Sequence, residues 1–194
     1  MRPLSFIIVG SGFRSLFFAR IAKRYPDLFH LNYLLCRTKE KADRLAEEQE
    51  IPTTTSPELC QESAPDFVVI AVGRGDVCTV AKQWIERGFP VLLETPAGET
   101  AEELKELWEL KEKKGARIQV AEQYHHYPVM AAGIQAVEQG KLGEPYGVSL
   151  SVAHDYHGAS LIRKMLHMGF EPMTLRGSRY TFPVRQTDSR YGPI

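Results

Sequence analysis

Two glycines directly after an apolar run are the residues whose spacing points most clearly to chemistry. The run 6–9 is followed by Gly10, Ser11 and Gly12, and Phe13 and Arg14 then begin a helical pattern. In a dinucleotide-binding fold the first glycine makes a tight turn, and the second lets the backbone approach a pyrophosphate at the helix N-terminus. A glycine pair also occurs in ordinary strand-to-helix turns, so the nucleotide site and the plain turn both remain open here.

Histidines are the second group of residues with chemical potential. The stretch 154–157 reads His-Asp-Tyr-His, and His125 and His126 precede it in an earlier loop. Histidine can act as an acid or a base near neutral pH. We expect 154–157 to extend a strand, in which His154 faces away from His157 and at most half of the set enters one pocket. The alternative is a purely structural role, and we expect no metal site.

The elements that must position these residues alternate between strand-like and helix-like patterns. Strands are expected at 6–9, 31–36, 67–72, 91–93 and 117–120, with a short extended piece at 51–53, and helices start near residues 13, 42, 77 and 100. Near-continuous apolar strands that alternate with amphipathic helices are typical of a parallel sheet covered on both faces. The predicted fold class is therefore α/β, a Rossmann-like doubly wound sheet, with ligands at the carboxyl ends of the strands.

Two helices have a predicted buried face. In the last predicted helix of the alternating part, Thr100 and Glu103 form a capping box and Gly115 ends the helix. The predicted faces themselves are Phe13, Leu16, Phe17, Arg20 and Ile21 in one helix, and Leu104, Leu107 and Trp108 in the other.

Four loops are expected to converge at the carboxyl edge of this sheet, namely 10–14, 36–38, 72–76 and 94–96. The loop 36–38 bears on the choice of cofactor, because a carboxylate there would bind the ribose 2′-hydroxyl of NAD. Arg37 stands there instead, and the first acid is Glu40. Arg37 either clamps the 2′-phosphate of NADP or is an exposed arginine at a helix start, so NADP is mildly favoured over NAD.

Composition excludes several classes of partner. The 194 residues are 43% hydrophobic and 25% charged, and the formal net charge is zero. The chain therefore has no overall electrostatic attraction for nucleic acid or for an anionic membrane. The apolar run 6–9 is too short for a signal sequence, which predicts a cytoplasmic protein. Cys36, Cys60 and Cys78 lack metal-type spacing and are expected to be reduced, buried or incidental thiols.

These motifs resemble the Gfo/Idh/MocA oxidoreductases, which act mainly on sugars, cyclitols and related polyols with a nicotinamide cofactor. The resemblance is carried by the segments 10–12, 42–48, 88–98 and 124–128. It implies a small-molecule, polyol-like substrate and NADP or NAD as cofactor. The implied cofactor-binding residues are Gly10, Ser11, Gly12, Phe13, Arg14, Arg37, Val72, Gly73, Glu94, Pro96 and Gln123.

The catalytic half of the family pattern is altered. Thr95 stands where the family's Glu-Lys-Pro motif has its lysine, and a threonine hydroxyl carries no positive charge and is a poor general base. A further family element consists of a leucine, an aspartate and a histidine, and these positions fall on Leu161, Arg163 and His167. A histidine that the family often has in the loop after the fourth strand falls near Val77. The candidate catalytic residues are Thr95, His157 and His167. The alternative is an inactive nucleotide-binding sensor or assembly protein.

A second unit is expected after residue 122, which divides the chain into a dinucleotide-binding domain, 1–122, and a partial α+β substrate or oligomerisation domain, 123–194. Its pattern predicts a helix from Met130 to Val137 and a strand from Val148 to Val152. Ser160 and His167 lie seven residues apart, so they can share a helix face. Because so few strands are only marginally stable alone, we expect this second unit to pair with the first domain or with another subunit of a homo-oligomer, or the sequence to be a truncated product. The sequence leaves open whether Ile194 is the natural end.

Overall fold

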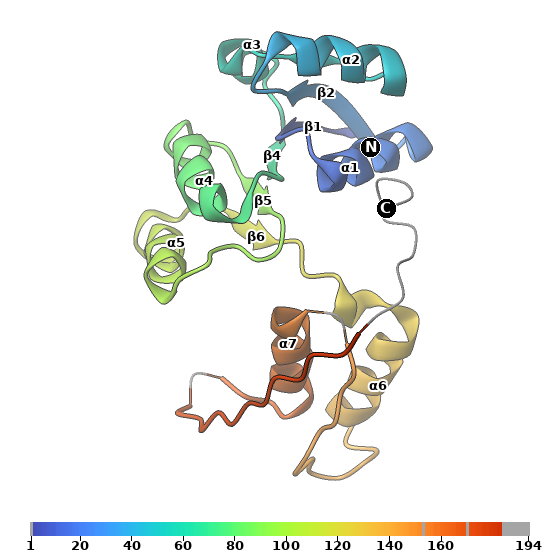
Figure 1. The fold of residues 1–194 in the computed structure, drawn as a ribbon, viewed down its shortest axis with the longest axis vertical. Helices are drawn as coiled ribbons and strands as arrows, with labels where there is room; N and C mark the ends of the chain where they lie inside the picture. The colour runs from blue at the N-terminus through green and yellow to red at the C-terminus, as the bar shows by residue number, and fades with distance from the viewer. Residues whose placement is uncertain (1, 153, 170, 184–194) are drawn as a thin grey trace.

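A computed structural model describes residues 2–152, 154–169 and 171–183 (Figure 1). Its centre is one parallel sheet of six strands in the order β3-β2-β1-β4-β5-β6. The strands are β1 Leu4–Val9, β2 Phe29–Leu35, β3 Thr53–Thr54, β4 Phe67–Ile70, β5 Val91–Leu93 and β6 Ile118–Val120. The α-helices are α1 Phe13–Arg24, α2 Lys39–Gln49, α3 Pro57–Glu62, α4 Val77–Glu86, α5 Ala101–Lys114, α6 Pro128–Glu138 and α7 Asp155–Met165, and the 3-10 helices are η1 Arg74–Asp76 and η2 Tyr124–His126.

Helices cover both faces of the sheet, which confirms the doubly wound α/β prediction. Successive side chains of β1 point to opposite faces. Ile7 joins a buried cluster with α4 and α5, whereas Ile8 joins one with α1 and α2. In Figure 1 α4 and α5 accordingly lie on one side of the strands and α1 on the other. The strand order changes direction between β1 and β4, and such a switch point is where open α/β sheets bind ligands.

The predicted face of α1 was largely wrong, although Leu16 packs against the buried core cluster. Phe17 is 38% exposed and Ile21 is 42% exposed, and the buried residues of the helix are Ser15, Ala19 and Ala22. Small side chains face the sheet because α1 starts immediately after the glycine turn and packs closely on the strands. Phe17 lies on the outer side, where the guanidinium groups of two arginines approach its ring at 4.8 and 5.7 Å.

The ends of α5 were predicted correctly and its buried face only in part. The capping box of Thr100 is present, and Gly115 ends the helix in the left-handed conformation. Leu107 is buried, but Leu104 and Trp108 are 49% and 50% exposed. Because α5 covers the edge of the sheet beside β6, it buries only a narrow line of side chains. The ammonium of Lys111 lies 4.8 Å from the Trp108 ring centroid.

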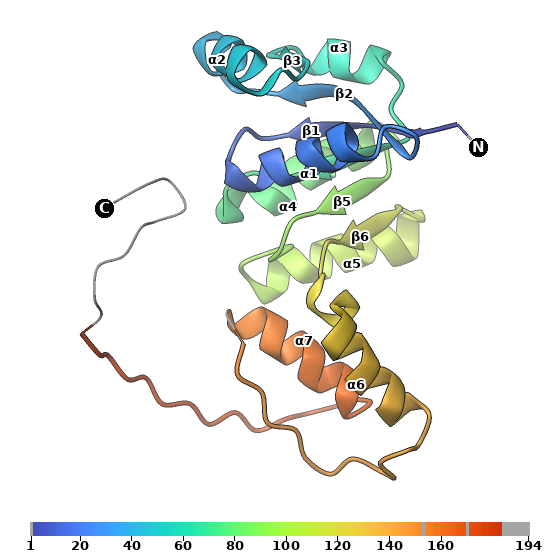
Figure 2. The same cartoon turned by 90° about the vertical axis from the view of Figure 1, so that its right-hand side faces the viewer.

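The unit after β6 differs from its prediction. α6 confirms the helix expected around Met130, but the expected strand from Val148 to Val152 is absent, and no segment of 121–152, 154–169 or 171–183 forms a strand. A strand needs a hydrogen-bonding neighbour, and these described segments offer none. The histidine-rich stretch forms the first turn of α7 instead, and Figure 2 shows α6 and α7 beyond β6. Asp155 at the start and Arg163 near the end of α7 complement the helix dipole.

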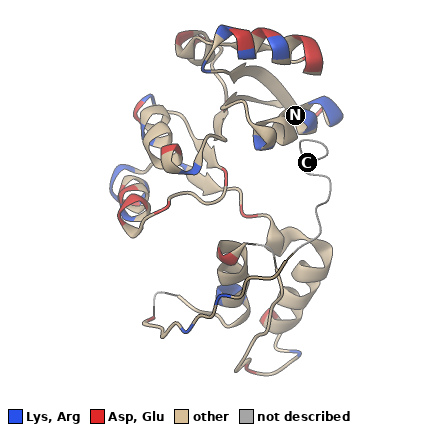
Figure 3. Ribbon diagram, viewed as in Figure 1, with Lys and Arg blue, Asp and Glu red and all other residues tan. Residues whose placement is uncertain are grey.

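The surface carries charges of both signs. Figure 3 shows acidic and basic residues intermixed on α2 and α5, which agrees with the neutral formal charge. Among the helices within the described ranges, none is long and apolar enough to cross a membrane. Cys36, Cys60 and Cys78 are free and buried, as predicted.

Candidate functional site

The turn after β1 explains the first glycine of the motif. Gly10 has φ +116°, and a Cβ atom on it would lie 2.3 Å from the carbonyl oxygen of Ala71, at the end of β4. The hydroxyl of Ser15 donates a hydrogen bond to that same oxygen at 3.2 Å. Ser15, at the third position of the motif, therefore ties α1 to β4 directly. Gly10 is required by the close approach of two strand ends.

The second glycine has a different role. Gly12 is the N-cap of α1, and a Cβ atom on it would meet nothing within 4 Å. No side chain within the described part of the chain caps α1, and its first turn holds no acid, whereas Thr38 caps α2 and Thr100 caps α5. Gly12 therefore leaves room beside the N-terminus of α1, where the helix dipole favours an anion.

A cavity of about 900 Å³ lies beside this helix start. Three of the four predicted loops line it, those after β1, β2 and β4, so their predicted convergence is confirmed. Sequence analysis missed Lys41, which lines the cavity next to Arg37. Burial raises the pKa of the Cys36 thiol, and a hydrogen bond with Ser11 opposes this shift. The predicted residues along the wall are Gly10, Ser11, Gly12, Phe13, Arg14, Arg37, Val72 and Gly73.

The fourth loop reaches the cavity only through an ion pair. Glu94 is 8% exposed and accepts a hydrogen bond from Nε of Arg14 at 3.0 Å. Its other oxygen accepts from both the backbone N–H and the hydroxyl of Thr95, each at 3.1 Å. Thr95 and Pro96, joined by a cis peptide bond, are outside the set of residues that line the cavity. Glu94 therefore links the cavity wall at Arg14 to the predicted catalytic position at Thr95.

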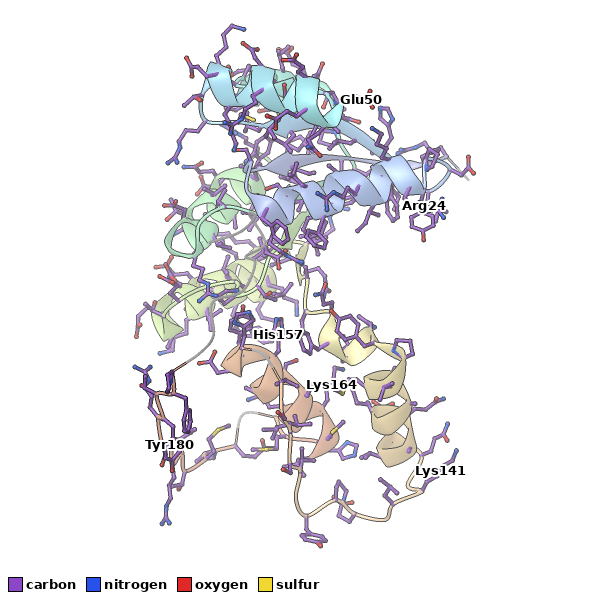
Figure 4. The ribbon with its side chains drawn as sticks, turned by 45° about the vertical axis from the view of Figure 1, so that its right-hand side comes forward. Arg24, Glu50, Lys141, His157, Lys164 and Tyr180 are labelled. Carbon is purple, nitrogen blue, oxygen red and sulfur yellow. The ribbon has the colours of Figure 1, made fainter. Side chains whose placement is uncertain are left out.

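A buried carboxylate–imidazole pair lies at the end of β6. Nδ1 of His157 is 2.7 Å from Oε2 of Glu122, and the two side chains are 7% and 14% exposed. The imidazole stacks on the ring of Tyr124 at 4.1 Å between centroids and 18° between planes. In Figure 4 His157 lies at the end of α7 that faces the sheet. Sequence analysis missed Glu122, although its place directly after a strand of a parallel sheet was a usable signal.

The first turn of α7 approaches the carboxyl edge of the sheet at more than one point. The guanidinium of Arg74, in the loop after β4, lies 5.8 Å from the Tyr156 ring centroid, and the Tyr156 ring is 4.5 Å from that of His157. Thr95 and Glu122 each follow the paired ends of β5 and β6 by two residues. Both residues therefore follow strands that pair with each other at this edge.

The other candidates do not join this group. His167 is exposed and lies beyond the end of α7, so it does not share a helix face with Ser160 as predicted. His157 lies in the first turn of α7 and His154 is the N-cap residue before it, so their predicted opposition across a strand was wrong. Gln123 is half-buried before η2 and is outside the set of residues that line the cavity.

Two positions that depart from the family pattern have structural roles here. Val77 is 2% exposed and packs in the core cluster on the α4 side of the sheet. Arg163 donates a hydrogen bond to the carbonyl of Gly169, which closes the end of α7.

Comparisons with known proteins agree with this geometry. The model of an oxidoreductase family with an NAD-binding Rossmann fold, GFO_IDH_MocA, matches residues 4–122. No curated protein matches the chain.

Several solved structures share the fold. GenD2 of gentamicin A biosynthesis, solved with NAD, is 19% identical, and the match covers 87% of this chain and 55% of GenD2 with a TM-score of 0.71. The WlbA dehydrogenase of Chromobacterium violaceum, solved with NADH and UDP-GlcNAcA, is 18% identical over 74% of this chain and 42% of WlbA, with a TM-score of 0.67. The apo scyllo-inositol dehydrogenase of Lactobacillus casei is 19% identical over 74% and 44%, with a TM-score of 0.64.

This chain therefore spans about half the length of the solved proteins it resembles. The family match covers its whole alternating part, from β1 to the residue that pairs with His157. The glycine turn, the uncapped start of α1 and the cavity at the switch point all fall within the matched range. The chain belongs to the Gfo/Idh/MocA family of oxidoreductases, with an NAD-binding Rossmann fold.

Proposed function

We propose that this protein is an NAD(P)-dependent oxidoreductase that acts on a sugar, a cyclitol or a related polyol. The observation that carries the proposal is the cavity of about 900 Å³, in which the loops after β1, β2 and β4 surround the uncapped start of α1. We also propose that the protein forms a homo-oligomer and is located in the cytoplasm. The sparse core of α6 and α7, where Ile134, His157 and Leu161 are the buried residues, supports the oligomer.

The residues around the cavity fit a dinucleotide. Gly12 leaves room for a pyrophosphate against the N–H groups of α1, and Arg14 is held at the wall by Glu94. A bound nicotinamide ring supplies the hydride acceptor or donor, while the protein orients it and handles the proton. Thr95 and His157 are the side chains that we assign to the substrate end of the site.

We further propose that NADP is preferred over NAD. Arg37 and Lys41 both line the cavity where β2 ends, and a 2′-phosphate would sit there. An Arg37→Gln variant should bind NADPH about tenfold more weakly and NADH unchanged, because only the phosphate loses a charged donor. Arg44→Gln is the matched control, since Arg44 lies farther along α2 with Glu48 at 3.9 Å. An equal loss for both nucleotides would refute the assignment.

Proton transfer falls to His157 in this proposal. Thr95 donates its hydroxyl proton to Glu94, so its oxygen remains an acceptor for a substrate hydroxyl. His157, which is bonded to Glu122 just after the neighbouring strand β6, takes or returns the proton of that hydroxyl. The polyol class is supported by the relatives, since one is named a scyllo-inositol dehydrogenase and another was solved with UDP-GlcNAcA.

A second candidate function is a nucleotide-binding sensor without turnover. Thr95 favours it, because threonine replaces the lysine of the family's Glu-Lys-Pro motif. Arg163 favours it as well, because it replaces the family's aspartate and donates a hydrogen bond to the carbonyl of Gly169. A Thr95→Lys variant separates the two readings. A gain in polyol-dependent reduction of NADP or NAD supports an oxidoreductase with weakened catalysis, whereas nucleotide binding without any gain in turnover supports the sensor.

A further inference from the structure

We infer that Glu122 is a positioning residue that holds the imidazole of His157 in one tautomer, with the proton on Nδ1 and with Nε2 free for acid–base exchange. The inference rests on the proposed oxidoreductase function, because it names the residue that prepares the proton-transfer group of that site.

The hydrogen bond fixes the tautomer. An ionised carboxylate can only accept hydrogen bonds, so Nδ1 of His157 must be the donor across the 2.7 Å to Oε2 of Glu122. The side chains of the pair are 7% and 14% exposed, so little water competes for the bond. A neutral imidazole that donates through Nδ1 leaves Nε2 without a proton, which is the form able to accept one.

The surroundings of the pair fix its orientation. The second carboxylate oxygen of Glu122 accepts the backbone N–H of Tyr124 at 2.9 Å, so the carboxylate is tied to the start of η2. The ring of Tyr124 then stacks on His157 from the side. One short segment therefore supplies both the acceptor and the stacking surface. This arrangement resembles the way in which carboxylates orient catalytic imidazoles in other enzymes.

Nε2 remains accessible. Among the residues that the structure describes, the one buried side-chain nitrogen or oxygen without a hydrogen-bond partner is Nδ1 of His125. No described group bonds Nε2 of His157, so Nε2 must reach space that solvent can enter. Within the same part of the chain, the pair thus combines a hydrogen-bonded Nδ1 with an Nε2 that no described group bonds.

The proton path that follows is balanced. In the oxidation of a carbinol, Nε2 of His157 would take the hydroxyl proton while the carbon–oxygen bond becomes a carbonyl, and a bound nicotinamide would supply the acceptor for the hydride. In the reverse direction Nε2 returns the proton to the carbonyl oxygen. Glu122 stays ionised throughout and exchanges no proton, which distinguishes a positioning residue from an acid or a base.

The test is a long-range ¹H–¹⁵N correlation spectrum of the full chain labelled with ¹⁵N-histidine, recorded at mildly alkaline pH, where an ordinary imidazole is neutral. A His157→Gln sample assigns the signal. We expect wild-type His157 to show a protonated Nδ1 and an unprotonated Nε2, and Glu122→Ala to shift it to the Nε2-protonated form. The control Glu144→Ala, at an exposed loop carboxylate, should leave the wild-type pattern unchanged.

An Nε2-protonated His157 in the wild-type chain would overturn the inference, even if Glu122→Ala failed to fold. An unchanged pattern in a folded Glu122→Ala chain would overturn it as well. A fluorescence titration of the same wild-type sample with NADPH keeps the two proposals apart. Binding with the wrong tautomer refutes only the role of Glu122, whereas the expected tautomer without binding refutes only the proposed function.

Discussion

Replacing the two glycines of the motif should have different effects, a loss of stability at Gly10 and a loss of nucleotide binding at Gly12. In a Gly10→Ala variant the new Cβ would lie 2.3 Å from the Ala71 carbonyl oxygen, and contacts below 3.0 Å essentially never occur. The ends of β1 and β4 must therefore separate by 0.7 Å, the difference between these distances. That movement strains the hydrogen bond from Ala71 N to Val9 O, which is 2.9 Å long.

The expected loss can be estimated from two contributions. Overpacking at a tight contact costs about 1–3 kcal/mol. Holding a non-glycine residue at φ +116° costs about 1–3 kcal/mol more. The sum of about 2–6 kcal/mol is a large part of the roughly 5–15 kcal/mol by which a typical protein is stable. Urea unfolding followed by tryptophan fluorescence measures it, because Trp84 is 1% exposed in the folded chain.

Gly12→Ser is the matched variant. Its side chain meets nothing within 4 Å and serine is a good N-cap, so we expect the free energy of unfolding to change by less than about 1 kcal/mol. NADPH binding should be lost, because the new side chain occupies the approach to the start of α1. A Gly10→Ala chain as stable as wild type would refute the packing argument. A Gly12→Ser chain that binds NADPH like wild type would refute the placement of the pyrophosphate.

Three further changes test other parts of the structure. Hydrogen bonds from Arg2 and Ser5 hold the pKa of Asp66 well below its ordinary value, so its stabilisation is present above about pH 4 and is lost as the pH falls further. Asp66→Asn should therefore lower the urea midpoint at neutral pH and match wild type in acid, and a pH-independent difference would contradict this. Thr100→Ala should remove about 1 kcal/mol of stability by breaking the capping box, and an unchanged urea midpoint would contradict this. Burial raises the pKa of Cys60 to about 12, so iodoacetamide should modify it only in denaturant, and rapid labelling of the folded chain would argue against its burial.

The order and type of most elements up to β6 could be predicted because apolar strands and amphipathic helices alternate clearly, but the short helix α3 was missed. The faces of α1 and α5 could not, since periodicity does not reveal how closely a helix packs. Ser15 and Ala19 face the sheet because they are small, and the larger Phe17 and Trp108 remain outside. The strand expected from Val148 had a fitting pattern, but it lacks a neighbouring strand within the described ranges.

The cavity was more predictable than the proton-transfer group. Gly10 and Arg37 follow strands, and the carboxyl ends of parallel strands meet at one edge, so their convergence follows from the fold class. The partnership of Glu122 and His157 joins residues 35 positions apart in the sequence. It depends on how α7 packs against η2, and no local pattern encodes that packing. His167 had the expected residue type, but α7 ends before it.

The central claim, a dinucleotide site at the start of α1, is tested most directly by titrating the folded 194-residue chain with NADPH and, separately, with NADH. The emission of the reduced nicotinamide reports binding. We predict saturable binding of both nucleotides, tighter for NADPH, and loss of that binding in Gly12→Ser. No saturable binding of either nucleotide by a chain that unfolds cooperatively in urea would contradict the account.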